Sequence, residues 1–338
     1  MATTTIVSTE RKLVWIVSVL LVLGFWAFDL FASCSTTVYL GFDSRLKPDL
    51  VGRLPATKEQ VQGFEIVRGK PLVAFPHLLL AFGSDKSVSF TPPDTIVGLT
   101  ADSTDHIRLQ TANGVQMLKE SGFEPDTRLT STVEGHLSNS GNSVFLDTSE
   151  KESQVHLVAR RDDGTALPVA NVKGTLHAIS WDELGLAAVI DNSLFVWEIG
   201  GPEFVRLKGD VGLQLARSVC LVGPRRAVVT LPNVVVLVTE DAQTPIAGFT
   251  ARCAWAHSIL YLLDERGGLI WSVTGLEQLG KRSADQAYAM KLLGELPANA
   301  DENAPRFLEA ARILGCEEAR KVRGATSTSN GRPSRVNP

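Results

Sequence analysis

Six histidines are the side chains in this sequence that could bind a metal or transfer protons near neutral pH. His77, His106 and His257 each stand at the start of a strand-like segment. A protein zinc site needs several ligands at short, characteristic spacings, and none of these histidines has a second ligand at such a spacing. We interpret the three as structural repeat positions, packed between neighbouring sheets and hydrogen-bonded to backbone, and we expect no metal site.

Short catalytic motifs are absent from the sequence. It contains no nucleophile elbow, no His-Glu-x-x-His, no P-loop and no dinucleotide-binding glycine pattern. The Gly/Ser-rich residues 138–143 lack the lysine and the helix start that a phosphate loop needs, so we interpret them as a surface loop. We therefore predict no catalytic residue and no cofactor.

The four cysteines do not form a recognisable framework. Cys34, Cys220, Cys253 and Cys316 include no Cys-x-x-Cys pair, which argues against a zinc site or a redox pair. Because so few cysteines in so long a chain are not typical of a disulfide scaffold, we expect free or buried thiols. No Asn-x-Ser/Thr acceptor occurs, which fits a cytosolic or bacterial chain.

The predicted strands and turns that would position any functional site recur at a regular interval in the sequence. Val115, Val155, Phe195 and Val235 are spaced by 40 residues, and each lies at the end of a segment that fits strand, turn and strand. Looser copies lie around Val88 and at residues 267–271. A period near 40 with several short strands in each unit is typical of a β-propeller.

The predicted hairpins share apolar strands and turns rich in Asn, Gly and Asp, which tolerate the positive φ of tight turns. Six such units fit between about residues 67 and 275, and an early strand at residues 38–39 could close the ring or belong to a further unit. Trp197 and Trp271 end two of the strands, and we assign them as structural repeat positions too. We predict an all-β fold, a β-propeller of six to seven blades, over residues 36–280.

One unit also resembles a known repeat. Residues 255–271 carry His257 and Ser258 before an apolar strand, then a Gly-Gly turn, then a strand that ends at Trp271. This order resembles a repeat of the regulator-of-chromosome-condensation propellers, although the units here are shorter and lack that family's Gly-Gln-Leu-Gly turn. The WD-repeat propellers are the nearest rival. Either resemblance implies a β-propeller, and neither carries functional residues onto this chain.

Residues 13–33 form an apolar segment that follows a short N-terminal flank, residues 1–12. The segment is long enough to cross a bilayer, and Trp15 and Trp26 stand near its ends, where indoles favour the interface. We predict a single-pass transmembrane anchor, with the side of the propeller left open. A cleaved signal, including a lipoprotein signal at Cys34, and a buried helix are the alternatives.

The C-terminal part of the chain changes character. Residues 284–323 are rich in Ala, Leu, Glu, Lys and Arg, and they predict a helical extension with two short helices, at 284–293 and 304–321. Residues 324–338 are polar and contain Gly, Ser and Pro, which predicts a disordered tail.

Composition limits the classes of function. The chain has 338 residues, of which 44% are hydrophobic and 21% charged, and its net charge of -4 provides no general basic field for nucleic acid. We expect a membrane-tethered, non-catalytic propeller that serves as a scaffold for a protein partner. The alternatives are an exported lipoprotein scaffold of an envelope complex, and a propeller enzyme or lectin with a site at its central channel.

Overall fold

The structure is a computed structural model that describes residues 41–329 apart from short gaps. The gaps are residues 57–58, 84–86, 102–106, 120–121, 126–134, 138–142, 150–153, 161–165, 182–183, 199–203, 208–211, 298 and 303. The predicted anchor or signal segment at residues 13–33 lies outside the described residues. Among the helices that are described, none is both long and apolar enough to span a bilayer.

Residues Leu40–Asp285 form one compact unit, and the residues from Gln286 onward belong to a second. The described strands of the first unit form six four-stranded antiparallel sheets. The first three sheets consist of β2 (Gly63–Val67), β3 (Lys70–Phe75), β4 (Leu78–Phe82) and β5 (Ser87–Phe90); β6 (Ile96–Ala101), β7 (Ile107–Thr111), β8 (Gly114–Lys119) and β9 (Gly122–Pro125); and β10 (Gly135–Leu137), β11 (Ser143–Ser149), β12 (Gln154–Arg160) and β13 (Ala166–Lys173).

The next two sheets also use consecutive strands. They consist of β14 (Leu176–Trp181), β15 (Gly185–Ile190), β16 (Ser193–Glu198) and β17 (Val205–Leu207), and of β18 (Ser218–Gly223), β19 (Arg226–Thr230), β20 (Val235–Thr239) and β21 (Gln243–Ala247). A 3-10 turn, η2 (Leu213–Leu215), lies between them in sequence.

The sixth sheet combines the two ends of this unit. β22 (Ala251–Ala256), β23 (Ile259–Asp264) and β24 (Leu269–Thr274) are joined by β1 (Lys47–Arg53), which pairs antiparallel with β24 along its whole length. The short turn η3 (Leu276–Gln278) follows β24.

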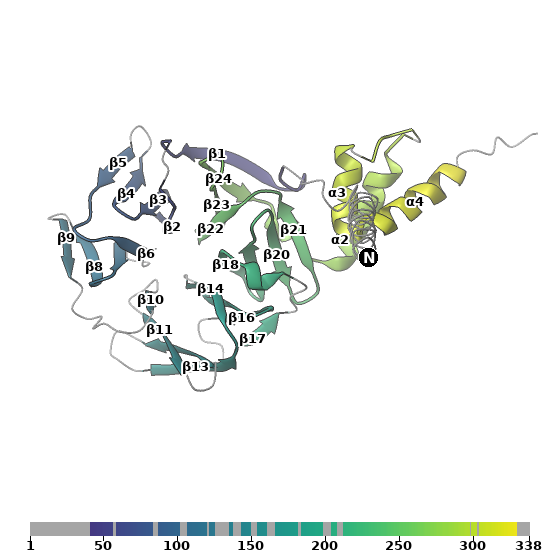
Figure 1. The fold of residues 1–338 in the computed structure, drawn as a ribbon. Helices are drawn as coiled ribbons and strands as arrows, with labels where there is room; N and C mark the ends of the chain where they lie inside the picture. Colours follow the sequence, from purple (N-terminus) through teal and green to yellow (C-terminus); the bar gives the residue numbers. More distant parts are fainter. Residues whose placement is uncertain are drawn as a thin grey trace, which may run out of the picture. The chain divides into compact units, whose positions relative to one another are not determined.

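The sheets follow one another around a closed ring (Figure 1). The first strand of each sheet contacts the first strand of the next, in the order β2, β6, β10, β14, β18 and β22, and β22 contacts β2 again. This arrangement confirms the predicted β-propeller. The prediction was six to seven blades. The described residues form six sheets, and they contain no seventh. The strand that joins the ends is β1, whereas the predicted closing strand at residues 38–39 lies outside the described residues.

The repeat found in the sequence corresponds to one strand of the sheets. Val115, Val155, Phe195 and Val235 all lie in the third strand of their sheets, β8, β12, β16 and β20. The looser copy around Val88 falls in β5, which is the fourth strand of its sheet rather than the third. In this sheet the hairpin predicted from the sequence therefore lies one strand too far along the chain. Its β3–β4 turn at residues 76–77 is Pro-His, which lacks the Gly or Asn that marked the other turns.

Packing between the sheets explains the nearly continuous apolar strands. Every residue of β15 and of β20 is buried, because both faces of these strands lie against other sheets. The cluster that contains Val228, Leu237, Leu260 and Leu262 combines residues of the β18–β21 sheet with residues of the β22–β24 sheet. The core of the propeller therefore lies between sheets.

Two cysteines join neighbouring sheets. Cys220 of β18 and Cys253 of β22 form a disulfide, with their Cα atoms 6.2 Å apart. The expectation of free or buried thiols is wrong for this pair, and it is wrong for Cys316, which is also disulfide-bonded. Cys220 and Cys253 are 33 residues apart in sequence, and only the adjacency of the two inner strands brings them together.

A buried ion network holds the segment that leads into β1. The Arg45 guanidinium donates to both carboxylate oxygens of Asp43, at 3.0 and 2.9 Å, and to Oδ1 of Asp285 at 2.6 Å. The other oxygen of Asp285 accepts from the Thr244 hydroxyl at 3.0 Å and from the Gly280 amide at 3.2 Å. Burial lowers the pKa of Arg45, but its hydrogen bonds with the two carboxylates outweigh this effect, and the pKa is raised.

The second unit contains the C-terminal helices. They are α2 (Arg282–Gly294), whose first residues precede the unit boundary, α3 (Pro305–Leu314) and α4 (Cys316–Ser329). The prediction of two short helices is wrong because Gly315, with φ of 86°, divides the second one into α3 and α4. The predicted disordered tail is also wrong for residues 324–329, which extend α4.

The Arg45 network predicts a large loss of stability in the variant Arg45→Met. Removing the cation leaves Asp43 and Asp285 buried without their counter-charge, which costs about 3–5 kcal/mol of unfolding free energy. Chemical denaturation of the full chain in detergent would measure this loss. The exposed Lys47 on β1 supplies the matched control, Lys47→Met, which should change the free energy by less than about 1 kcal/mol. Equal losses in the two variants would contradict the assignment.

Candidate functional site

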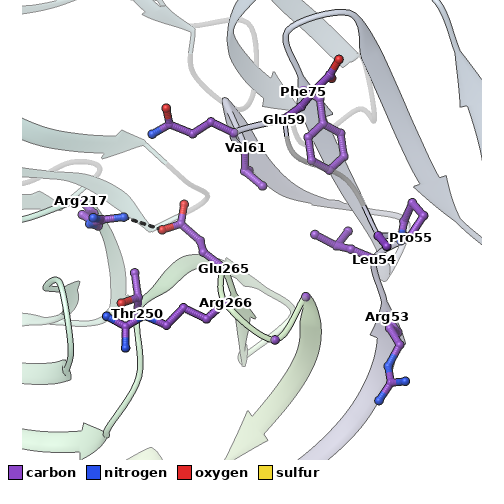
Figure 2. A pocket seen from close by; sticks show the side chains of 14 residues that line it. Arg53, Leu54, Pro55, Glu59, Val61, Phe75, Arg217, Thr250, Glu265 and Arg266 are labelled. Carbon is purple, nitrogen blue, oxygen red and sulfur yellow. Dashed lines mark hydrogen bonds and ion pairs between the residues drawn. The ribbon is translucent and has the colours of Figure 1, made fainter.

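A pocket of about 760 Å³ lies where three inner strands begin. Its walls come from the segments just before β2, β18 and β22, from the end of β1 and from the β23–β24 turn. We call it the Glu265 pocket (Figure 2). It is lined by residues 53–56, 59–61, Phe75, Arg217, Thr250 and 265–268.

Glu265 is held between two arginines. Its Oε2 accepts from Arg217 at 2.8 Å, and its Oε1 accepts from Nε of Arg252 at 2.8 Å. The Glu265 side chain is 12% exposed, whereas that of Arg217 is 45% exposed and faces the pocket. The carboxylate therefore has a cation on each oxygen, an arrangement that fixes its position within the wall.

The segment after β1 is fastened to this charged wall at two points. The Leu54 amide donates to the Gly268 carbonyl at 2.7 Å, and Arg252 donates to the Val61 carbonyl at 2.7 Å. Arg252 thus joins Glu265 and the segment before β2 through a single guanidinium. One of the two fastenings is between backbone groups, and the other depends on the Arg252 side chain.

The opposite side of the pocket combines apolar side chains with the polar residues Arg53, Glu59 and Gln60 of the same segment. Val61 and Phe75 are buried beneath it, and Leu54 and Pro55 extend along it. Figure 2 shows Arg217, Glu265 and Arg266 on one side and Leu54 and Pro55 on the other. A ligand in this space would meet Arg217, Arg266 and the Glu265 carboxylate on one side, and Leu54 and Pro55 together with charged groups of the same segment on the other.

The residues predicted from the sequence lie elsewhere. His77 is in the β3–β4 turn and His257 in the β22–β23 turn, and both side chains are exposed, so neither is packed between sheets as expected. His106 lies outside the described residues. Because His77 follows a second strand and His257 follows a first strand, the two do not occupy equivalent places in their sheets.

The two tryptophans lie in equivalent strands. Trp197 in β16 and Trp271 in β24 both belong to the third strand of a sheet. Trp197 is buried, and the ring of Trp271 packs edge-on against Phe42 with centroids 5.5 Å apart. These positions belong to the packing of the sheets.

Sequence reasoning missed the residues of the Glu265 pocket. Arg217 and Arg252 lie next to the starts of two inner strands, and Glu265 lies in a turn, so no short motif joins them. The sequence could indicate this pocket only once the inner strand of each sheet is known. Residues that precede the inner strands meet at one end of the ring, so they could then be grouped as candidates. Across the described ranges, no group of three or more His, Cys, Asp or Glu side chains is placed to hold a metal ion.

The geometry predicts that Arg252 keeps the segment between β1 and β2 in place. In Arg252→Met, amide hydrogen exchange in fragments covering residues 54–62 should rise by about tenfold, because the loss of about 1.4 kcal/mol of local stabilisation corresponds to that factor. Mass spectrometry of the exchanged full chain would measure it. Arg217→Met, which removes a contact with Glu265 but none with Val61, is the control and should leave this exchange nearly unchanged. Similar increases in both variants would contradict the role of Arg252.

Comparisons with known proteins assign the chain to no family. No family model matches the chain, and no curated protein does. Similar solved structures include a gluconolactonase from Xanthomonas campestris, with 12% identity, coverage of 70% of this chain and 96% of that one, and a TM-score of 0.48. A chain of the mitotic checkpoint complex shares 11% identity over 67% of this chain and 94% of its own, with a TM-score of 0.47. Hsv2 from Kluyveromyces lactis shares 11% identity over 62% and 72%, with a TM-score of 0.41. The resemblance to the regulator-of-chromosome-condensation propellers stays a prediction.

Proposed function

We propose that this chain is a membrane-tethered, non-catalytic β-propeller that acts as a scaffold and binds a protein partner at the Glu265 pocket. The observation that carries the proposal is the pairing within the pocket: Glu265 is enclosed by Arg217 and Arg252, and apolar side chains face them. A carboxylate with a cation on each oxygen is fixed in position, which suits it to shaping a surface that a partner contacts.

The position of the pocket also supports a binding role. Its lining residues 55, 56, 59 and 60 are exposed, so a protein segment can reach it from solvent. Loops carried on a rigid scaffold are where binding residues gather in proteins. Here the scaffold is the closed ring, and the loops that precede its inner strands carry the charged residues.

The tether rests on the sequence of residues 13–33. Its apolar length suits a bilayer, and β1 begins a short distance further along the chain, at Lys47. The chain would therefore present the propeller close to a membrane surface.

The tether is tested by extraction of membranes at alkaline pH. The full chain should remain in the membrane pellet, and a variant that lacks residues 13–33 should appear in the supernatant, because the apolar segment is the proposed anchor. Mass spectrometry of the N-terminal peptide separates the lipoprotein alternative, which requires a lipid on Cys34. Release of the full chain into the supernatant would contradict the tether.

The binding site is tested by photo-crosslinking in cells that express the full chain. A photoreactive side chain at Gln60 and one at Ala56, both exposed at the pocket, should capture the same protein species. The control position is Arg206 on β17, an exposed residue of an outermost strand in another sheet. Capture of that species from position 206 as efficiently as from Gln60 and Ala56 would contradict the assignment of the pocket as the partner site.

A further inference from the structure

The pocket has unused capacity to bind an anion. Within the described structure, Arg217 gives one side-chain hydrogen bond to Glu265, and Arg266 gives one to Oδ1 of Asn233 at 2.7 Å. Each guanidinium has further N–H donors in its planar fork. Both side chains line the pocket and are exposed, so these donors are available to a ligand there.

The charged side chains that line the pocket carry a net positive charge, which also suits an anion. The lining contains the cations Arg53, Arg217 and Arg266 and the anions Glu59 and Glu265, which leaves one net positive charge. Behind the lining, Arg252 and Asp264 add one charge of each sign. The site is thus cationic in a chain whose net charge is -4. A local excess of positive charge in an acidic protein favours a negatively charged ligand at this place.

The ligand must also suit the facing wall. Leu54 and Pro55 present hydrocarbon across from the arginines, and burial of an apolar side chain against them would add to the affinity. A small polar anion would leave this wall exposed. A peptide that carries a carboxylate next to a Leu or Phe side chain would use both walls at once.

We infer that the Glu265 pocket binds an acidic segment of the partner protein, with its carboxylate on Arg217 and Arg266 and an adjacent apolar side chain against Leu54 and Pro55. This inference rests on the proposed function, and it names the class of ligand at the same site. Charge complementarity at the two arginines and the apolar side chains that face them are the observations that carry it.

The test uses short fluorescein-labelled peptides in which Asp or Glu stands next to Leu or Phe, with fluorescence anisotropy of the full chain in detergent as the readout. Two comparison sets replace the acid with Lys or the apolar residue with Ser. The acidic–apolar peptides should bind at least about tenfold more tightly than either comparison set, and high salt should weaken them. Glutarate, a small dicarboxylate, serves as the competitor.

Variants assign the binding to the pocket. Arg217→Gln and Arg266→Gln should each weaken the acidic–apolar peptides by about tenfold. Arg206→Gln makes the same change on β17 and should have no effect. Arg217→Lys and Arg266→Lys keep the charge but lose the fork, and should give intermediate values. Thermal unfolding of each variant shows whether it is folded.

Three results would overturn the inference. The first is equal binding of acidic and basic peptides, and the second is an equal effect of the pocket variants and of Arg206→Gln. The third is displacement of the peptide by glutarate at concentrations close to the dissociation constant of the peptide, because a small dicarboxylate would then bind as well as the peptide. If the peptides fail while the crosslinks from Gln60 and Ala56 still capture one partner, the scaffold function stands and the ligand class is wrong. If the crosslinks fail as well, both are wrong.

Discussion

The pairing of β1 with β24 is the interaction on which the rest of the propeller depends. The inner strands contact one another around the ring in chain order, but the last sheet obtains its outer strand from the opposite end of the unit. Without β1, β24 would expose an unpaired edge. The Arg45 network strengthens this closure, because Asp43 and Arg45 precede β1 while Thr244 and Asp285 lie near the other end of the unit. Ring closure therefore combines a backbone ladder with a buried ion network.

The same closure also builds the candidate site. The residues that follow β1 supply the apolar side chains of the Glu265 pocket, and Leu54 is bonded to the backbone of Gly268 in the β23–β24 turn. Arg252, at the start of the last sheet, bonds the far end of this segment at Val61. The pocket thus exists only in a closed ring. Stability and binding are linked here because one segment of chain serves both.

Much of the fold could be predicted because its signals are local. Val115, Val155, Phe195 and Val235 mark the third strands, since each lies in an apolar segment that repeats at a step of 40 residues. β1 could not be predicted in this way: its sequence contains Pro48, Asp49 and Gly52, most of its side chains are exposed, and only its long-range partner makes it a strand. The Cys220–Cys253 disulfide and the pocket arginines were missed for the same reason. They depend on which sheets are neighbours, which is a property of the closed ring.

The overall charge of the chain restricts how the proposed recognition can work. A protein with a net charge of -4 repels an acidic segment at long range, so long-range attraction is not available to speed the encounter. Any preference for acid must then arise at contact, where the Arg217 and Arg266 guanidinium groups meet the ligand within a Debye length. Arg252 is placed differently, since it is not one of the lining residues and its guanidinium bonds Glu265 and the Val61 carbonyl. The arginines therefore divide into one that maintains the shape of the pocket and two that are placed to select its ligand.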